Sequence, residues 1–144
     1  MYKKKLFWTA LTLFYLLFIF SNSMRAAPES SVQSQGLLRL IEKCVPFVVH
    51  NLGLSEHILR KMAHFGEYLV LGLLLAQTVK VYGFFQIRQF WIVLSAGFLM
   101  AAADEGIQLF MEGRSGQFSD VMLDLSGVIT GLFVWRMINF FRTK

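Results

Sequence analysis

The first group of ionisable side chains that could act together in catalysis or binding lies between residues 60 and 67. His64 lies four residues after Arg60 and three before Glu67. At about 100° per residue these three positions share one face of a helix. A histidine beside a carboxylate can act as a general base or a nucleophile, and an arginine can neutralise charge that develops on a phosphate. His64 and Glu67 are therefore the candidate catalytic residues, although no established catalytic motif surrounds them.

Acidic residues form two further groups at helical spacing. Asp104 lies four residues before Gln108, with Glu105 beside it, and Asp120 lies four residues before Asp124. Carboxylate oxygens suit hard cations such as Mg²⁺ or Ca²⁺, and a nearby histidine would make Mn²⁺ or Zn²⁺ acceptable. No cofactor is required by the sequence, but a divalent cation is an option. The candidate metal ligands are Glu67, Asp104, Glu105, Asp120 and Asp124.

Basic residues accompany these acids and could bind phosphate. Arg60 and Lys61 open the first group, and Arg114 lies in a short stretch between the two acidic groups. Arginine presents a bidentate fork to phosphate, whereas lysine presents a point charge. We expect all of these side chains to surround one polar cavity. Its predicted residues are Arg60, Lys61, His64, Glu67, Asp104, Glu105, Gln108, Arg114, Asp120 and Asp124.

The composition shows what kind of scaffold must position these groups. The chain has 144 residues, of which 56% are hydrophobic and only 16% charged, whereas a soluble domain carries about 25% charged residues. At about 20 residues per spanning helix, the length allows about four spans and no separate soluble domain. The single Cys44 cannot form an intrachain disulfide. The sequence therefore predicts an all-α, polytopic membrane helix bundle with a single domain, residues 1–144.

The apolar runs locate the spans. Residues 6–24 carry no charge and follow three lysines, which is typical of a spanning helix, although a cleaved signal peptide has a similar pattern. The other runs reach spanning length only when they include ionisable residues, each costing roughly 2.5–3.5 kcal/mol near a helix centre in lipid. These groups should therefore face one another inside the bundle. We expect spans at about 6–24, 62–79, 89–110 and 120–141.

The outer loop, residues 25–61, contains an apolar and charged stretch at 37–43. This stretch predicts an amphipathic helix in the membrane interface that ends before Pro46, with residues 45–54 dipping shallowly into the membrane.

Gly127 and Gly131 continue the stripe of Asp120 and Asp124 along the last predicted span. Small residues four apart allow a neighbouring helix to approach closely, so we expect the acidic face of this helix to point into the bundle. A purely structural role for the polar groups is the alternative, in which buried hydrogen bonds fix the register of the helices.

Charge asymmetry predicts the orientation. All nine acidic residues lie in the predicted outer loops or in the outer halves of helices. The side of the bundle opposite the acidic residues carries only basic charges. By the positive-inside rule this side faces the cytoplasm, and both termini lie on it. The net charge of +5 follows from this arrangement, and no nucleic-acid-binding pattern accompanies it. The cytoplasmic basic residues are Lys3, Lys4, Lys5, Lys80, Arg88, Arg136, Arg142 and Lys144.

Three blocks of the sequence, in order, resemble the signatures of the VanZ-like family of small bacterial membrane proteins. The resemblance implies a multi-pass protein of the bacterial plasma membrane, in a family whose founding member is linked to teicoplanin resistance. Many members have asparagine at the position of Asp124. The blocks are Arg60-Lys61-x-x-His64-Phe65-x-Glu67-Tyr68, Asp104-Glu105-x-x-Gln108-x-Phe110 and Gly113-Arg114-Ser115-Gly116-x-x-x-Asp120-Val121-x-x-Asp124-x-x-Gly127.

Two functional hypotheses follow. In the first, the cavity engages an anionic lipid or a lipid-linked cell-wall precursor at the outer leaflet and thereby affects teicoplanin susceptibility. In the second, the protein is a membrane enzyme that acts on a lipid phosphate, with or without the help of a metal ion, through His64 and the acidic cluster. A transporter is a weaker third option, since no polar path through the membrane is evident. The sequence leaves open whether catalysis occurs, and it leaves the oligomeric state open.

Overall fold

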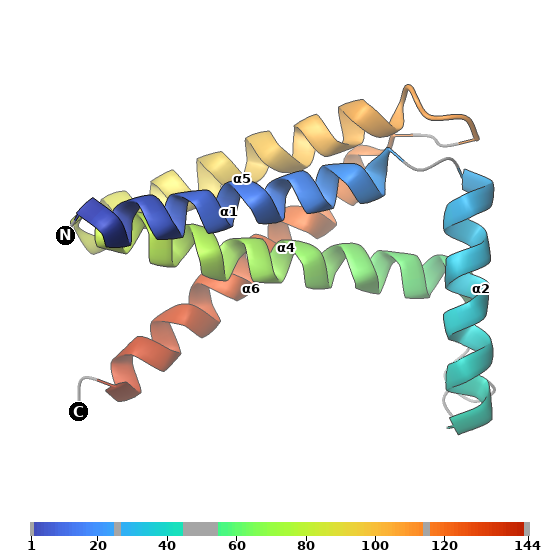
Figure 1. The fold of residues 1–144 in the computed structure, drawn as a ribbon, viewed down its shortest axis with the longest axis horizontal. Helices are drawn as coiled ribbons and strands as arrows, with labels where there is room; N and C mark the ends of the chain where they lie inside the picture. Colours follow the sequence, from blue (N-terminus) through green and yellow to red (C-terminus); the bar gives the residue numbers. More distant parts are fainter. Residues whose placement is uncertain (1, 25–26, 45–54, 114–115, 143–144) are drawn as a thin grey trace.

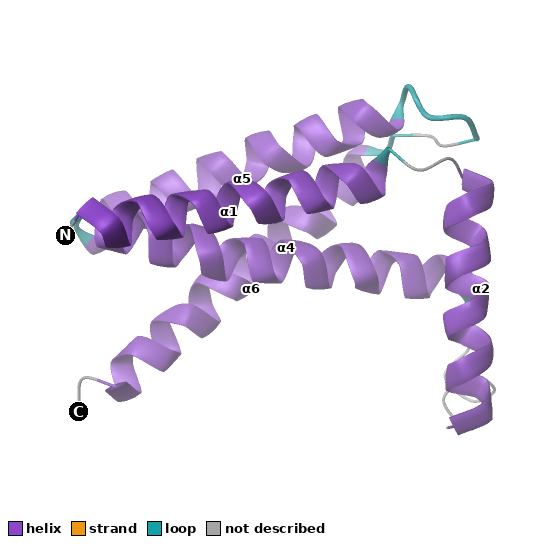
Figure 2. Cartoon of the chain, in the orientation of Figure 1, coloured by secondary structure: helices purple, strands orange, loops and turns teal. Residues whose placement is uncertain are grey.

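The computed structural model describes residues 2–24, 27–44, 55–113 and 116–142, and these residues form helices and turns, without a strand (Figure 2). Four of the helices are long and apolar enough to cross a membrane. The predicted all-α bundle with about four spanning helices is therefore confirmed. The helices are α1 (Tyr2–Ser23), α2 (Ala27–Cys44), α4 (Glu56–Val81), α5 (Gln86–Gln108) and α6 (Phe118–Arg142).

The spanning helices run alternately up and down the bundle, so both termini lie at the same end (Figure 1). Helix α2 lies at the opposite end, across the direction of the other helices (Figure 1). An even number of spans requires both termini to be on one side of the membrane. Which side that is remains the prediction drawn from the charges.

All five helices begin earlier than the sequence pattern indicated, and the difference is largest for α2 and α4. Helix α4 starts at Glu56 rather than at residue 62, because the Ser55 side chain caps it by accepting a hydrogen bond from the Ile58 backbone N–H at 3.3 Å. Helix α2 covers 27–44 and not only 37–43, since Pro28 is tolerated in the first helical turn. The predicted shallow dip at residues 45–54 lies outside the described residues.

Helix α1 is joined to α4 by polar contacts within the bundle. The Thr12 hydroxyl lies 2.8 Å from the Thr78 hydroxyl, and the Asn22 side-chain amide donates to Glu67 Oε1 at 2.8 Å. These contacts couple helix α1 to α4 at two points along its length.

Helices α4 and α6 pack most closely, because glycine removes side-chain bulk from both surfaces. A Cβ atom on Gly127 would lie 2.6 Å from the Phe65 carbonyl oxygen, and one on Gly131 would overlap the Leu69 carbonyl oxygen. In return, Gly72 of α4 faces the backbone of Val128. This contact brings the first turns of α6 against the polar face of α4, where the candidate site lies.

Candidate functional site

A cavity of about 190 Å³ lies at the end of the bundle where α4 and α6 begin and α5 ends. Polar and ionisable side chains from all three helices, together with the turn that follows α5, form its wall. The lining residues are His57, Arg60, Lys61, His64, Glu105, Gln108, Gly113, Gln117, Asp120, Leu123 and Asp124.

Most of the residues predicted for the polar cavity line it. Asp104 and Glu67 do not, although Asp104 lies directly behind the wall, near His64 and Asp124. Arg114 lies outside the described residues, so its predicted role stays a prediction. The predicted residues in the lining are Arg60, Lys61, His64, Glu105, Gln108, Asp120 and Asp124.

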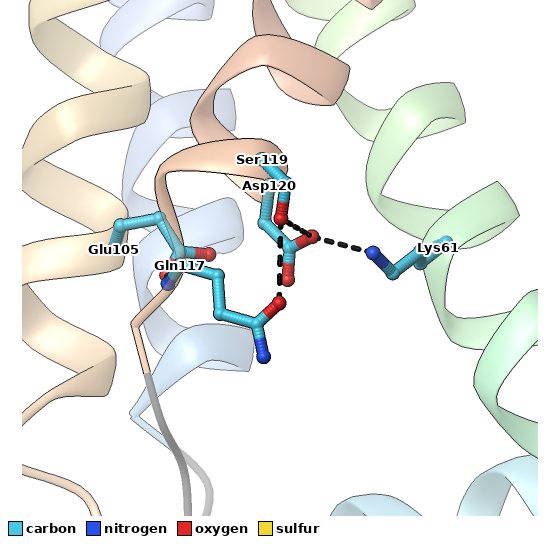
Figure 3. Close-up of polar contacts among 5 residues, drawn as sticks. All are labelled: Lys61, Glu105, Gln117, Ser119 and Asp120. Carbon is cyan, nitrogen blue, oxygen red and sulfur yellow. Dashed lines mark hydrogen bonds and ion pairs between the residues drawn. The ribbon is translucent and has the colours of Figure 1, made fainter.

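Lys61 and Asp120 form an ion pair across the rim of the cavity, between α4 and α6. The Lys61 ammonium lies 2.7 Å from Asp120 Oδ1, and the Ser119 hydroxyl lies 3.3 Å from that same oxygen (Figure 3). Both charged side chains are about one-third exposed, so the pair contributes at most about 1 kcal/mol to stability. Its main consequence is that the lysine ammonium is held at the entrance of the cavity.

Glu105 ties the end of α5 to the start of α6. Its side chain is buried, and Oε2 accepts a hydrogen bond from the Gln117 backbone N–H at 3.0 Å (Figure 3). Gln117 directly precedes the first residue of α6, where free backbone N–H groups and the helix dipole favour a carboxylate. Glu105 therefore both closes the turn between the two helices and forms part of the cavity wall.

At the floor of the cavity the imidazole of His64 and the carboxylate of Asp124 form the lining, and the buried carboxylate of Asp104 lies directly behind them. One donor atom from each of His64, Asp104 and Asp124 lies within 4.8 Å of the other two. Asp104 is fully buried and its Oδ2 accepts a hydrogen bond from the Gln108 amide at 3.3 Å. Asp124 is 1% exposed, and neither of its carboxylate oxygens has a hydrogen-bond partner among the described residues. One nitrogen and two oxygens thus come together where both carboxylates are buried and the imidazole is half-buried.

Glu67 points toward α1 instead of forming part of the cavity lining. Its carboxylate accepts the hydrogen bond from Asn22, which couples the C-terminal end of α1 to α4. The neighbouring Tyr68 is also structural, since its buried hydroxyl donates to the Met100 carbonyl at 3.3 Å. Among the candidate catalytic residues, His64 lines the cavity and Glu67 does not.

Several lining residues were not predicted. His57 would have been found if the helix had been extended back to Ser55, because positions 57, 61 and 64 then share one helical face. The sequence gives no indication of the role of Gln117, since this residue contacts Glu105 through its backbone N–H and not through its side chain. The unpredicted lining residues are His57, Gly113, Gln117 and Leu123.

Comparison with known proteins gives one match. A family model described as VanZ/LLP1 matches residues 6–139, which include all four spanning helices in whole or large part. No curated protein and no solved structure gives a significant match to the chain.

Proposed function

This chain belongs to the VanZ/LLP1 family of membrane proteins, and on that premise we propose that its cavity binds the phosphate-bearing head group of an anionic lipid or a lipid-linked cell-wall precursor. The protein is a multi-pass membrane protein. In the proposed orientation both termini lie in the cytoplasm, as the distribution of basic residues predicts. The cavity lies at the end of the bundle away from the termini, which corresponds to the outer leaflet of the plasma membrane.

The observation that carries this proposal is a polar cavity with cations at its rim, built into helices that are otherwise apolar. Ionisable groups inside a membrane are costly and are usually retained for function. The Lys61 ammonium has three N–H donors, so its hydrogen bond to Asp120 leaves two for phosphate oxygens. Arg60 is 3.9 Å from Glu56 and adds a second cation, whose planar fork suits a phosphate. Hydroxyl and amide groups of a sugar or peptide could then meet the acceptors Glu105 and Gln108.

Binding of this kind connects the cavity to teicoplanin susceptibility. Glycopeptide antibiotics act on precursors that face outward, where the proposed cavity lies. A protein that engages the precursor or the lipid around it competes with the antibiotic or shields its target. Reduced teicoplanin susceptibility is the cellular effect that we propose.

Lys61→Gln should weaken retention of a polyprenyl phosphate by about 10- to 100-fold, since a charge-assisted hydrogen bond contributes about 1.5–3 kcal/mol. Native mass spectrometry of the purified protein in mild detergent would measure this retention, with phosphatidylcholine as the lipid that should not compete. Lys80→Gln is the matched control, because it removes the same charge from the opposite end of α4. Equal retention by the two variants would contradict phosphate recognition by the cavity. Equal retention of phosphatidylcholine, whose phosphate is balanced by the choline cation, would contradict selection of an anionic head group.

Hydrolysis of a lipid phosphate is the second candidate function, and the position of His64 favours it. The imidazole lines the cavity and has a donor atom within 4.8 Å of the carboxylates of Asp104 and Asp124. A carboxylate at this position can orient an imidazole and stabilise its protonated form. The histidine would take a proton from a water molecule that attacks phosphorus, and the bond from phosphorus to the lipid oxygen would break to release the lipid alcohol and inorganic phosphate. In the alternative, the imidazole attacks phosphorus, the lipid alcohol leaves, and water then releases phosphate from the histidine.

If the protein is such an enzyme, His64→Gln should lower the rate of phosphate release from polyprenyl phosphate by about 10²-fold or more. The same variant should retain the lipid, so that kcat falls while lipid binding persists. The measurement is release of inorganic phosphate by purified protein. Absence of release by the wild type would reject the enzyme and leave the binding function standing.

A further inference from the structure

Three spanning helices each contribute one metal-binding side chain to a single buried point. His64 comes from α4, Asp104 from α5 and Asp124 from α6. Their donor atoms lie within 4.8 Å of one another although the residues are far apart in the sequence. Convergence from three separate helices requires the fold to be complete, so such a site would be absent from the unfolded chain.

Asp124 gives an independent reason to expect a ligand at this point. The side chain lines the cavity floor, is 1% exposed, and makes no hydrogen bond or ion pair within the described part of the chain. Buried polar groups in folded proteins almost always have partners, and a buried carboxylate without one is costly. No partner is present among the described residues, and a proton, a water molecule or a bound cation would satisfy this carboxylate.

The surrounding charges favour a cation. Asp104 lies beside Asp124, and Glu105 is in the same wall, so several carboxylates repel one another in a region of low dielectric constant. The nearby rim cations are held by other acids, Lys61 by Asp120 at 2.7 Å and Arg60 by Glu56 at 3.9 Å. A divalent ion would offset this concentration of negative charge.

The donor set indicates which ion. One imidazole nitrogen and two carboxylate oxygens suit first-row divalent ions such as Mn²⁺ or Zn²⁺ better than Ca²⁺ or Mg²⁺, which prefer oxygen alone. With metal–ligand distances of about 2.0–2.2 Å, ligand atoms lie about 3.3 Å apart in a tetrahedron and up to about 4.4 Å apart in an octahedron. Small side-chain adjustments would bring the three donors onto one ion.

We infer that His64, Asp104 and Asp124 bind one divalent transition-metal ion, Mn²⁺ or Zn²⁺, at the floor of the cavity. Three protein ligands leave at least one coordination position open, and the cavity provides room for water or a phosphate oxygen there. The site needs no lipid in order to form, so the inference stands independently of the proposed function.

Titration calorimetry on the full-length protein tests this site. The protein is purified in mild detergent without added lipid phosphate, treated with EDTA and desalted, then titrated with MnCl₂, ZnCl₂ or MgCl₂. We expect about one Mn²⁺ or Zn²⁺ per chain and much weaker Mg²⁺ binding. Asp124→Asn should weaken binding by more than the roughly 10–100-fold that loss of a supporting partner costs at metal sites.

Glu112→Gln is the control, since it removes an exposed carboxylate near the same end of the bundle but outside the cavity lining. Its affinity for Mn²⁺ should equal that of the wild type. If wild-type protein binds neither Mn²⁺ nor Zn²⁺, or if Asp124→Asn binds them as tightly as Glu112→Gln does, the inferred site is wrong. A proton or water would then satisfy Asp124.

A spectroscopic measurement needs no variant and so does not depend on the folding of Asp124→Asn. Electron spin-echo envelope modulation of the Mn²⁺-loaded wild type should show coupling to one imidazole nitrogen. Coupling to none would overturn the assignment of His64 as a ligand. Metal-free wild type that still retains polyprenyl phosphate would separate a failure of the metal site from a failure of the proposed function.

Discussion

Gly131→Ala should destabilise the protein by at least about 1–3 kcal/mol, the usual cost of overpacking a well-packed contact. A Cβ atom at this position would overlap the Leu69 carbonyl oxygen of α4. Backbone atoms of a helix cannot rotate away as the end of a flexible side chain can, so the two helices must separate. Since α4 and α6 together supply most of the cavity lining, their separation should also reduce retention of polyprenyl phosphate.

Gly66→Ala is the matched control for this change. A Cβ atom on Gly66, also in α4, would have no neighbour within 4 Å, so the substitution should stabilise the helix by up to about 1 kcal/mol. Unfolding of both variants in increasing SDS, followed by far-UV circular dichroism, would compare their stabilities. Equal stabilities would show that α4 and α6 are not in close contact at Gly131.

The fold was largely predictable because the apolar runs and the cost of charge in lipid both constrain it. Four spans follow from the length of these runs, even though their ends differ from those observed. The ends could not be placed from hydropathy, since capping by Ser55 depends on local backbone geometry that an apolar count does not detect. The polar residues of α2 gave no hydrophobic run, so its first turns were assigned to a loop.

The burial of the site's ionisable residues was predictable, because the cost of charge in lipid alone requires them to lie inside the bundle. Burial of Glu105 and Asp124 follows from the argument that ionisable groups should not face lipid. Glu67 shows the limit of that argument, because its hydrogen bond to Asn22 depends on where α1 packs. Nothing in the sequence indicates which of several carboxylates on adjacent helices will face a cavity and which will face a neighbouring helix.

Two aspartates one turn apart on α6 differ in role. Asp120 contributes to stability, whereas we assign Asp124 to function. Asp120 is partly exposed and paired with Lys61, whereas Asp124 is buried and has no hydrogen-bond partner among the described residues. Selection for stability alone would keep Asp120 and replace Asp124, since a buried carboxylate without a partner costs free energy. The same substitution at the two positions should therefore have opposite effects on folding.

Asp124→Asn should stabilise metal-free protein by about 1–3 kcal/mol, because it replaces a buried carboxyl group that has no partner among the described residues with a neutral amide that can donate to the neighbouring Asp104. Asp120→Asn should instead destabilise it by at most about 1 kcal/mol, through loss of the exposed pair with Lys61. SDS-induced unfolding in EDTA would measure both. We also expect Asp124→Asn to restore teicoplanin susceptibility to that of cells without the protein, at unchanged abundance. A less stable Asp124→Asn variant would mean that this carboxylate holds the bundle together, and that its charge is structural.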